Sequence, residues 1–422
     1  MNSRRLRFGA GFLLTFLAII GLGTTVLAAP KTLVRDEIDS EFKWDLSDIY
    51  DDWDSWEDDM VKIEGLMADY TNLQGSLNQG PRQILKANQM GDELGQLAGK
   101  LYRYAALHSV TNTADNDISA QVQRVRILFS KFGTAMAWFN PEMLEIPWAT
   151  MEKWLADTPE LKPYAFGITD LYRQQEHVLT EESEQLLSYF NQALGSPGQI
   201  YGELSTSDIE YPEITLSDGE TVTVTPGQYY TILSTNRNQE DRRKAFEAFY
   251  GVYHKKANTY ASIYNGILQG NWARSQARNY ESSLKSALDG NNIPTEVYEN
   301  LVEMVREGSD PLHRYIALRK KVLGLDEYHG YDGSIPLVDF DKKYPWKTIR
   351  EDIVASVAPL GKDYQKKMAE AFSGGWVDVY ENEGKRSGAF SAGVYGVHPY
   401  MLLNYNETLG SFFTTAHEMG HS

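Results

Sequence analysis

The fold is best approached from residues 409–421, which read LGSFFTTAHEMGH. The apolar residues of this stretch recur at the three- and four-residue spacing of an amphipathic helix. Thr408 precedes the stretch, and threonine is a residue type that caps helix N-termini. We therefore predict a helix that begins after Thr408. It carries His417 and His421 one turn apart, on the same face.

This pattern has a direct chemical meaning. Two imidazoles on one helical face can converge on a single Zn²⁺ ion. Glu418 lies beside the first histidine, where its carboxylate can reach a metal-bound water without binding the metal. Zinc lowers the pKa of such a water toward about 7, and the carboxylate takes its proton as the oxygen attacks a carbonyl group. The motif predicts a hydrolase with one Zn²⁺ per chain, His417 and His421 as ligands, and Glu418 as general base.

The third ligand of this site is not evident. Catalytic zinc sites use three protein ligands and leave the fourth position to water. With helical motifs the third ligand normally lies downstream, and the sequence ends at Ser422. Asp378, Glu381 and Glu407 are available upstream, but exposed acids are ordinary on an acidic protein. We expect the chain to be the front part of a longer enzyme, cut off after the zinc-binding helix and inactive alone.

The segment before the helix is unusual in its glycine content. Four glycines are spread through it, at positions Gly384, Gly388, Gly393 and Gly396. Glycine lets the backbone turn tightly or approach a ligand. Residues 400–405 then read as a short strand after Pro399. We predict that Gly393, His398 and Tyr400 help to bind the substrate.

The upstream sequence is mainly helical. Leucines and a tyrosine recur at helical spacing between 94 and 107, and Ser196-Pro197-Gly198 indicates a break. Residues 209–216 and 221–225 flank Asp218-Gly219, which is typical of a β-hairpin. A capped helix restarts at Thr225-Pro226. We predict a mainly α fold with a small β element, divided into an N-terminal helical domain (29–205) and a catalytic domain (206–422).

Composition excludes several classes of protein. The chain has 422 residues and a formal net charge of −18. Such an acidic protein is repelled by phosphate backbones, so we predict no nucleic-acid partner. The sequence contains no cysteine, which excludes disulfides, thiolate catalysis and cysteine-based zinc sites. Any metal must therefore be held by His, Asp and Glu.

The N-terminus is typical of an export signal. Arg4, Arg5 and Arg7 are followed by a nearly continuous apolar stretch and by small residues ending at Ala28. We predict a signal peptide over residues 1–28, cleavage after Ala28, a periplasmic or extracellular location, and no stable membrane insertion after cleavage. An uncleaved N-terminal membrane anchor is the alternative, because the apolar stretch nearly reaches spanning length.

Three segments near the end of the sequence resemble a known family. They are KRSGAFSAG (385–393), HPYMLLNY (398–405) and FFTTAHEMGHS (412–422). Together they are very similar to oligoendopeptidase F, the bacterial branch of the thimet oligopeptidase family of zinc metallopeptidases. EHVLTEE (176–182) resembles the end of that family's N-terminal helical domain.

The resemblance implies a multi-helix oligopeptidase fold with a zincin-type active-site helix and a channel between two halves. It implies cleavage of short peptides, with the strand from Tyr400 holding the peptide backbone by its edge. By the motif match, His417 and His421 are zinc ligands and Glu418 is the general base. The family's third ligand, a glutamate, and its transition-state-stabilising tyrosine and histidine are expected beyond Ser422.

Two alternative functions remain open from the sequence. One is a non-catalytic peptide-binding remnant, in which the channel walls persist without metal. The other is a different zinc hydrolase with the same His-Glu-x-x-His motif and a downstream histidine ligand. Metal content and the effect of replacing Glu418 distinguish them. The sequence does not indicate an oligomeric state.

Overall fold

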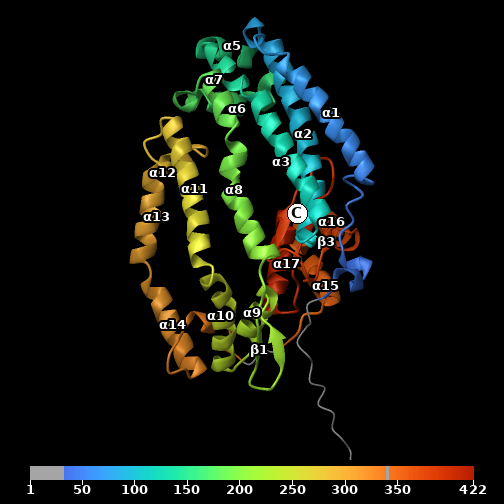
Figure 1. Cartoon of the computed structure of the whole chain (residues 1–422), viewed down its shortest axis with the longest axis vertical. Helices are drawn as coiled ribbons and strands as arrows, with labels where there is room; N and C mark the ends of the chain where they lie inside the picture. Colours follow the sequence, from blue (N-terminus) through green and yellow to red (C-terminus); the bar gives the residue numbers. More distant parts are fainter. Residues whose placement is uncertain (1–32, 339–341) are drawn as a thin grey trace, which may run out of the picture.

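The computed structural model describes residues 33–338 and 342–422, and helices dominate it (Figure 1). The predicted signal peptide lies outside the described residues. The first half contains α1 (Trp53–Thr71), α2 (Pro81–Thr111), α3 (Asn116–Met136), α4 (Phe139–Glu145), α5 (Trp148–Asp157), α6 (Ala165–Arg173), α7 (Glu181–Ser188) and α8 (Asn191–Gly202). The second half contains α9 (Pro226–Thr235), α10 (Gln239–His254), α11 (Ala257–Ala277), α12 (Ser283–Asp289), α13 (Thr295–Glu307), α14 (Asp310–Leu323), α15 (Trp346–Ser356), α16 (Lys362–Ser373) and α17 (Leu409–His421). The prediction of a mainly α fold is confirmed.

One predicted boundary is wrong. The expected break at residues 196–198 lies inside α8, which continues through Pro197 to Gly202. Proline in a helix removes a hydrogen bond and crowds the preceding turn. Here the ring packs closely on α11, where a Cβ added to Gly266 would lie 3.0 Å from Pro197 Cγ. Packing between α8 and α11 therefore overrides the local preference of the sequence.

The N-terminal helices α1, α2 and α3 pack on one another around a large apolar core. The leucines and the tyrosine that predicted a helix between 94 and 107 all lie buried on α2. Trp56 of α1 is 1% exposed, and its indole Nε1 donates a hydrogen bond to Leu101 O at 3.0 Å. The indole thus buries a large apolar ring and still satisfies its polar group.

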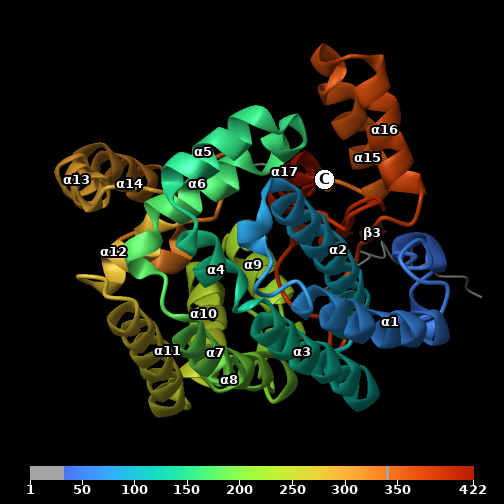
Figure 2. The ribbon, with the colours of Figure 1, turned by 90° about the horizontal axis from the view of Figure 1, so that it is seen from above.

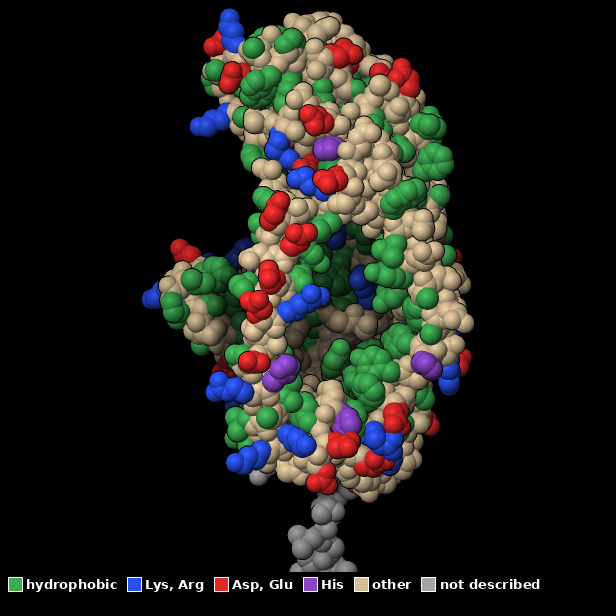
Figure 3. Space-filling view, turned by 90° about the vertical axis from the view of Figure 1, so that its left-hand side faces the viewer, with side chains coloured by type: hydrophobic (Ala, Val, Ile, Leu, Met, Phe, Trp, Pro, Cys, Tyr) green, Lys and Arg blue, Asp and Glu red, His purple; other side chains and the backbone are tan. Residues whose placement is uncertain are grey.

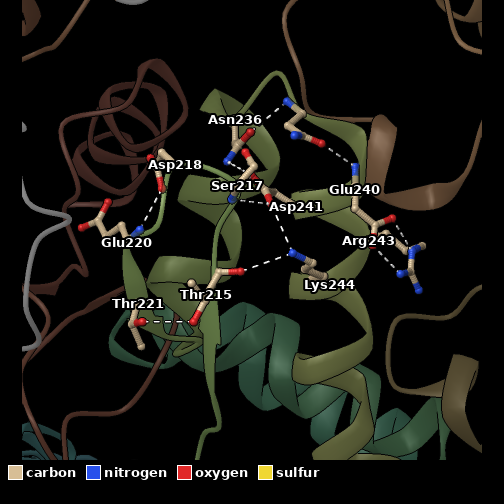
Figure 4. Close-up of polar contacts among 11 residues, drawn as sticks. Thr215, Ser217, Asp218, Glu220, Thr221, Asn236, Glu240, Asp241, Arg243 and Lys244 are labelled. Atoms are coloured by element: carbon tan, nitrogen blue, oxygen red, sulfur yellow. Dashed lines mark hydrogen bonds and ion pairs between the residues drawn. The ribbon is translucent and has the colours of Figure 1, made fainter.

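The predicted hairpin is present and is held against α10 (Figure 4). Strands β1 (Glu213–Thr215) and β2 (Thr221–Thr223) pair in antiparallel fashion, and Gly219 adopts a φ of 92° in the turn. Asp241 is buried and accepts hydrogen bonds from Ser217 N at 3.0 Å and Ser217 Oγ at 2.7 Å. This carboxylate fixes the hairpin to the start of α10.

A three-stranded sheet lies next to the C-terminal helix. Its order is β3 (Val377–Asp378), β5 (Tyr400–Leu402) and β4 (Phe390–Ala392), with β5 parallel to β3 and antiparallel to β4. Side chains alternate across β5 because a strand has a period of two. Tyr400 and Leu402 join the core of the N-terminal helices, whereas Met401 joins the core formed with α15, α16 and α17. The sheet thus connects two cores.

The N-terminal segment 33–50 belongs to this region too. Val379 N donates to Phe42 O at 2.9 Å, and Asp45 N donates to Gly375 O at 2.7 Å. Both bonds lie on the side of β3 away from β5. The N-terminal domain expected over residues 29–205 therefore has its first residues packed on the sheet. The boundary of this domain at residue 205 stays a prediction.

The helices enclose a hollow. Figure 1 shows α11, α13 and α14 on one side of an elongated molecule, and α1, α2 and the sheet on the other, while Figure 2 shows the same separation from above. Figure 3 shows a hollow midway along the long axis with many apolar side chains on its walls. Large exposed apolar side chains also follow α13 and α14, among them Leu301, Val305 and Leu318. None of the helices in the described ranges combines the length and apolarity needed to cross a membrane.

Candidate active site

The predicted helix α17 has the predicted start. Thr408 Oγ1 accepts a hydrogen bond from Ser411 N at 3.1 Å, so it caps the helix as expected. Thr415 and Met419 form the buried side of α17, and both are less than 5% exposed. Because His417 and His421 lie on the other side, both histidines are exposed. The sequence therefore places the two imidazoles at the surface of a helix whose opposite face is fixed in the core.

The two imidazoles face each other. His417 Nε2 and His421 Nε2 are 3.2 Å apart, and the ring planes are nearly perpendicular at 87°. Two ligands bound at about 2.05 Å with a tetrahedral angle would hold their donor atoms roughly 3.3 Å apart. The observed separation is therefore close to one edge of a zinc tetrahedron. Two imidazole nitrogens at this separation are a donor set that fits a zinc ion.

Glu418 lies between the two histidines in the sequence of α17. It is half-buried, and within the described ranges no hydrogen bond or ion pair engages its carboxylate. Its backbone oxygen accepts from Ser422 N at 3.2 Å, which completes the last turn of α17. A carboxylate that is not held by a protein partner is available to bind a proton from a reacting group.

Two of the three upstream carboxylates, those of Asp378 and Glu381, are engaged by other groups. Asp378 is paired with Lys385 at 2.6 Å and with Arg35 at 2.7 Å. Glu381 lies at the N-terminus of α9, where Thr225 Oγ1 donates to it at 3.4 Å. Across residues 33–338 and 342–422, no group of three His, Asp or Glu side chains is placed to hold a metal ion. The described residues thus bring together two of the predicted zinc ligands.

The three residues predicted to contact substrate occupy different environments. His398 stacks on Trp376 with ring centroids 4.3 Å apart, and its Nε2 lies 3.1 Å from Asp48 Oδ2. Its other ring nitrogen contacts Pro399 O at 2.8 Å. Both nitrogens are therefore engaged within the protein, which favours a structural role for this ring.

Tyr400 and Gly393 differ from His398 and from each other. The side chain of Tyr400 is fully buried in β5, and its hydroxyl oxygen has no hydrogen-bond partner in the described structure. The side chain of Tyr400 is therefore not available to a peptide. Gly393 is exposed directly after β4, with no described atom within 4 Å of the position of an added Cβ. Gly420 is similarly open, with no described atom within 4 Å of the position of an added Cβ.

The edge of the sheet that could hold a peptide is that of β4. Strand β5 is central, so both of its edges already have neighbours. Met401 N donates to Trp376 O at 2.8 Å, which shows that the peptide groups of Met401 face β3. Ser391 lies opposite Met401, and in an antiparallel pair of this kind both residues turn their peptide groups outward. Ser391 N–H and C=O therefore point to the edge of β4 that has no described strand beside it.

Two further residues of this site were not identified from the sequence. Asn404 Nδ2 donates to Arg386 O at 3.0 Å and to Gly388 O at 2.8 Å, and so it ties the glycine-rich segment to the end of β5. Ser391 Oγ lies 2.8 Å from Ser422 Oγ, which connects β4 with the end of α17. No spacing or motif distinguishes such residues from surface polar residues. Only the fold brings them together.

This combination of a helical fold and a His-Glu-x-x-His helix beside a small sheet defines a class of metallopeptidase-like proteins. Residues 232–422 match the family described as Peptidase family M3, and residues 142–211 match the one described as Oligopeptidase F. The two matches together span more than half of the chain. The chain belongs to peptidase family M3, in its oligopeptidase F branch.

Individual relatives agree with this assignment. Oligopeptidase PepF from Bacillus subtilis is 34% identical over 92% of this chain and 58% of its own length. An oligoendopeptidase F homolog from Lactococcus lactis is 32% identical over 92% of this chain and 65% of its own. The crystal structure of oligoendopeptidase-F from Enterococcus faecium superposes with a TM-score of 0.65 and 28% identity, covering 75% of this chain and 60% of that one. The chain thus spans less than two thirds of each of these relatives.

Proposed function

We propose that this chain carries the zinc-binding helix and the peptide-binding sheet of an oligoendopeptidase, an enzyme that cleaves short peptides internally. The observation that carries the proposal is the pair of imidazole nitrogens 3.2 Å apart on α17, with Glu418 beside them. The relatives named oligopeptidase or oligoendopeptidase support the same reaction. Short peptides are the proposed partners, and no nucleic acid is expected at such an acidic protein.

In this proposal each residue has a defined role. His417 and His421 hold the zinc ion, which when bound supplies a Lewis acid that polarises water and a carbonyl group. Glu418 accepts a proton from the attacking water as the new carbon–oxygen bond forms. It then delivers this proton to the amine nitrogen as the carbon–nitrogen bond breaks, so that the carboxylate is regenerated. Catalytic sites normally use three protein ligands, so we expect the 422-residue chain alone to hold zinc weakly and to turn over little peptide.

The open edge of β4 gives the substrate a place to bind. A peptide added beside β4 would exchange hydrogen bonds with Ser391 N–H and C=O, and such strand addition gives affinity that does not depend on sequence. Because β4 contacts α17 and Ser391 reaches Ser422, this peptide would lie next to the two histidines. The proposal therefore replaces the edge of the strand from Tyr400, expected from the resemblance, with the edge of β4.

Metal analysis and cleavage assays test the proposal. In the polypeptide encoded by the complete reading frame, wild-type protein should contain one zinc per chain and cleave an internally quenched peptide. His417→Ala should lose the metal. Glu418→Gln should keep the metal and lose turnover, because it retains the shape of the side chain without its basicity. Cleavage that persists after chelation, or an active Glu418→Gln variant, would refute the proposed mechanism.

The same experiment separates the alternatives. A peptide-binding remnant would bind peptide without zinc, and replacing Glu418 would leave every activity unchanged. A different zinc hydrolase would contain zinc but would leave the quenched peptide intact.

We also propose that the protein is exported, from the basic and apolar composition of residues 1–28. N-terminal sequencing of the protein recovered from outside the cytoplasm should begin at Ala29. An intact N-terminus in the membrane fraction would instead support the anchored alternative.

A further inference from the structure

A buried cluster of charges lies at the end of β3. Asp378 is 1% exposed, and its two carboxylate oxygens are shared between Lys385 Nζ at 2.6 Å and the guanidinium of Arg35 at 2.7 Å. Burial opposes ionisation of Asp378, but the two neighbouring cations outweigh it and lower the pKa of this carboxyl. The carboxylate therefore stays charged and keeps both cations. Lys385 Nζ also donates to Tyr380 O at 2.6 Å, which holds the backbone beyond β3.

Arg35 reaches this cluster from the other end of the sequence. It is separated from Asp378 by 343 positions, and it also donates to Asn382 Oδ1 at 3.2 Å. The segment that carries it is held along β3 by backbone bonds, including Glu383 N to Leu33 O at 3.0 Å. These backbone bonds hold the segment beside β3 without the Arg35 side chain. The side chain then adds the contact with Asp378.

Lys385 begins the chain that leads to β4. The next residue, Arg386, donates its backbone N–H to Val110 O at the end of α2, at 2.8 Å. Its carbonyl oxygen is then held by Asn404, and Phe390 opens β4 four residues later. The chain from the charged cluster to β4 is thus short and runs directly through Lys385, with each end of it held by the protein.

We propose that Arg35 and Lys385 are positioning residues for the peptide-binding edge of β4, acting through Asp378. This inference rests on the proposed function, because the edge matters only if a peptide binds there. Neither side chain touches the two histidines in the described structure, so loss of either should misplace the edge and leave the zinc ligands intact. A residue that only stabilised the fold would weaken all parts of the protein together.

The test centres on Arg35, whose side chain is 24% exposed, rather than on the fully buried Lys385. We would compare wild type, Arg35→Met, Arg35→Lys and the control Arg82→Met, which removes an exposed pair with Glu160. Three quantities are measured: amide hydrogen exchange of residues 386–392 and of α1 to α3, zinc content, and binding of a fluorescein-labelled peptide that carries a reduced amide bond.

Arg35→Met should accelerate amide hydrogen exchange in residues 386–392, because loss of the contact between Arg35 and Asp378 lets this segment open locally. Exchange in α1 to α3 should stay as in wild type. Peptide affinity should fall by roughly 3- to 10-fold, the loss expected when about one backbone hydrogen bond to Ser391 is weakened. Zinc content should stay as in wild type. Arg35→Lys should recover part of both effects, because it keeps the charge and loses the two-pronged contact.

Unchanged exchange in residues 386–392 of Arg35→Met would overturn the inference, as would exchange that rises equally in α1 to α3. If wild type bound no peptide, the proposed function would fail instead. Exchange at residues 386–392 would then still decide whether Arg35 positions β4.

Discussion

Gly227 offers a sharp test of how α9 is joined to the sheet region. This glycine lies in the first turn of α9, and a Cβ added to it would lie 2.3 Å from Glu381 Oε2. Ordinary contacts of a Cβ begin at 3.4 Å. In Gly227→Ala the carboxyl group of Glu381 must therefore leave its position at the helix N-terminus. The backbone of Gly227 is not left-handed, so the substitution adds no strain of its own.

The loss in the free energy of unfolding caused by Gly227→Ala follows from the contacts that Glu381 loses. Glu381 accepts from Gly227 N–H and from Thr225 Oγ1, and losing such bonds at this half-buried group costs about 1–3 kcal/mol. Losing the favourable placement at the helix N-terminus adds about 0.3–1 kcal/mol. The better helix propensity of alanine offsets up to about 1 kcal/mol. We expect the free energy of unfolding to fall by about 2 kcal/mol.

Urea denaturation followed by circular dichroism measures this change. Gly195→Ala in α8 is the matched control, since no atom lies within 4 Å of its added Cβ, and it should leave the protein equally or more stable. The decisive comparison is between the effect of Gly227→Ala in the wild-type protein and its effect in a Glu381→Ala protein, where the clash is absent. If Gly227→Ala destabilised both backgrounds by the same amount, the clash with Glu381 would not be its cause.

Three further predictions concern other buried or capped groups. Arg242→Met leaves Asp332 buried without the cation that now lies 2.6 Å away, so the free energy of unfolding should fall by about 3–5 kcal/mol; an unchanged urea midpoint would contradict this. Thr408→Ala removes the bond to Ser411 N and should cost about 1 kcal/mol, seen as faster amide exchange in the first turn of α17, whereas Thr408→Ser should behave as wild type. Lys385 and Arg35 hold the pKa of Asp378 below its ordinary value in the folded protein despite burial, so its contribution to stability is present above about pH 4 and is lost as pH falls through the folded pKa. Asp378→Asn should therefore unfold with a shallower pH dependence below about pH 4, and an acid profile as steep as that of wild type would count against the pairing.

Local patterns in the sequence predicted much of the secondary structure. The cap at Thr408, the leucine spacing of α2 and the turn at Asp218-Gly219 are each decided by residues within a few positions of one another. Pro197 was misjudged because the contact that accommodates it, Gly266 of α11, is remote in sequence. Local rules cannot include such a contact.

The candidate site likewise combines features that nearby residues determine with features that depend on contacts remote in sequence. The motif alone predicted that His417 and His421 would share a face, because helical geometry fixes that relation. The sequence could not indicate that β5 would be central, since strand order depends on how distant segments pair. For the same reason the sequence did not predict the role of Arg35. An arginine near the N-terminus cannot be distinguished from a solvated surface cation until the fold places Asp378 beside it.

The pairing of residues 33–50 with the sheet bears on how the chain folds during synthesis. His398 and Asp48 are 350 positions apart, and Arg35 and Asn382 are 347 positions apart. Domains generally fold from the N-terminus as the ribosome delivers them, so α1 to α3 can assemble while the partners of the first segment are still untranslated. That segment must wait, unpaired and open to proteases or chaperones, until its partners between residues 375 and 398 have emerged. Contacts so distant in sequence also form slowly, which makes the assembly of this sheet the expected late step of folding.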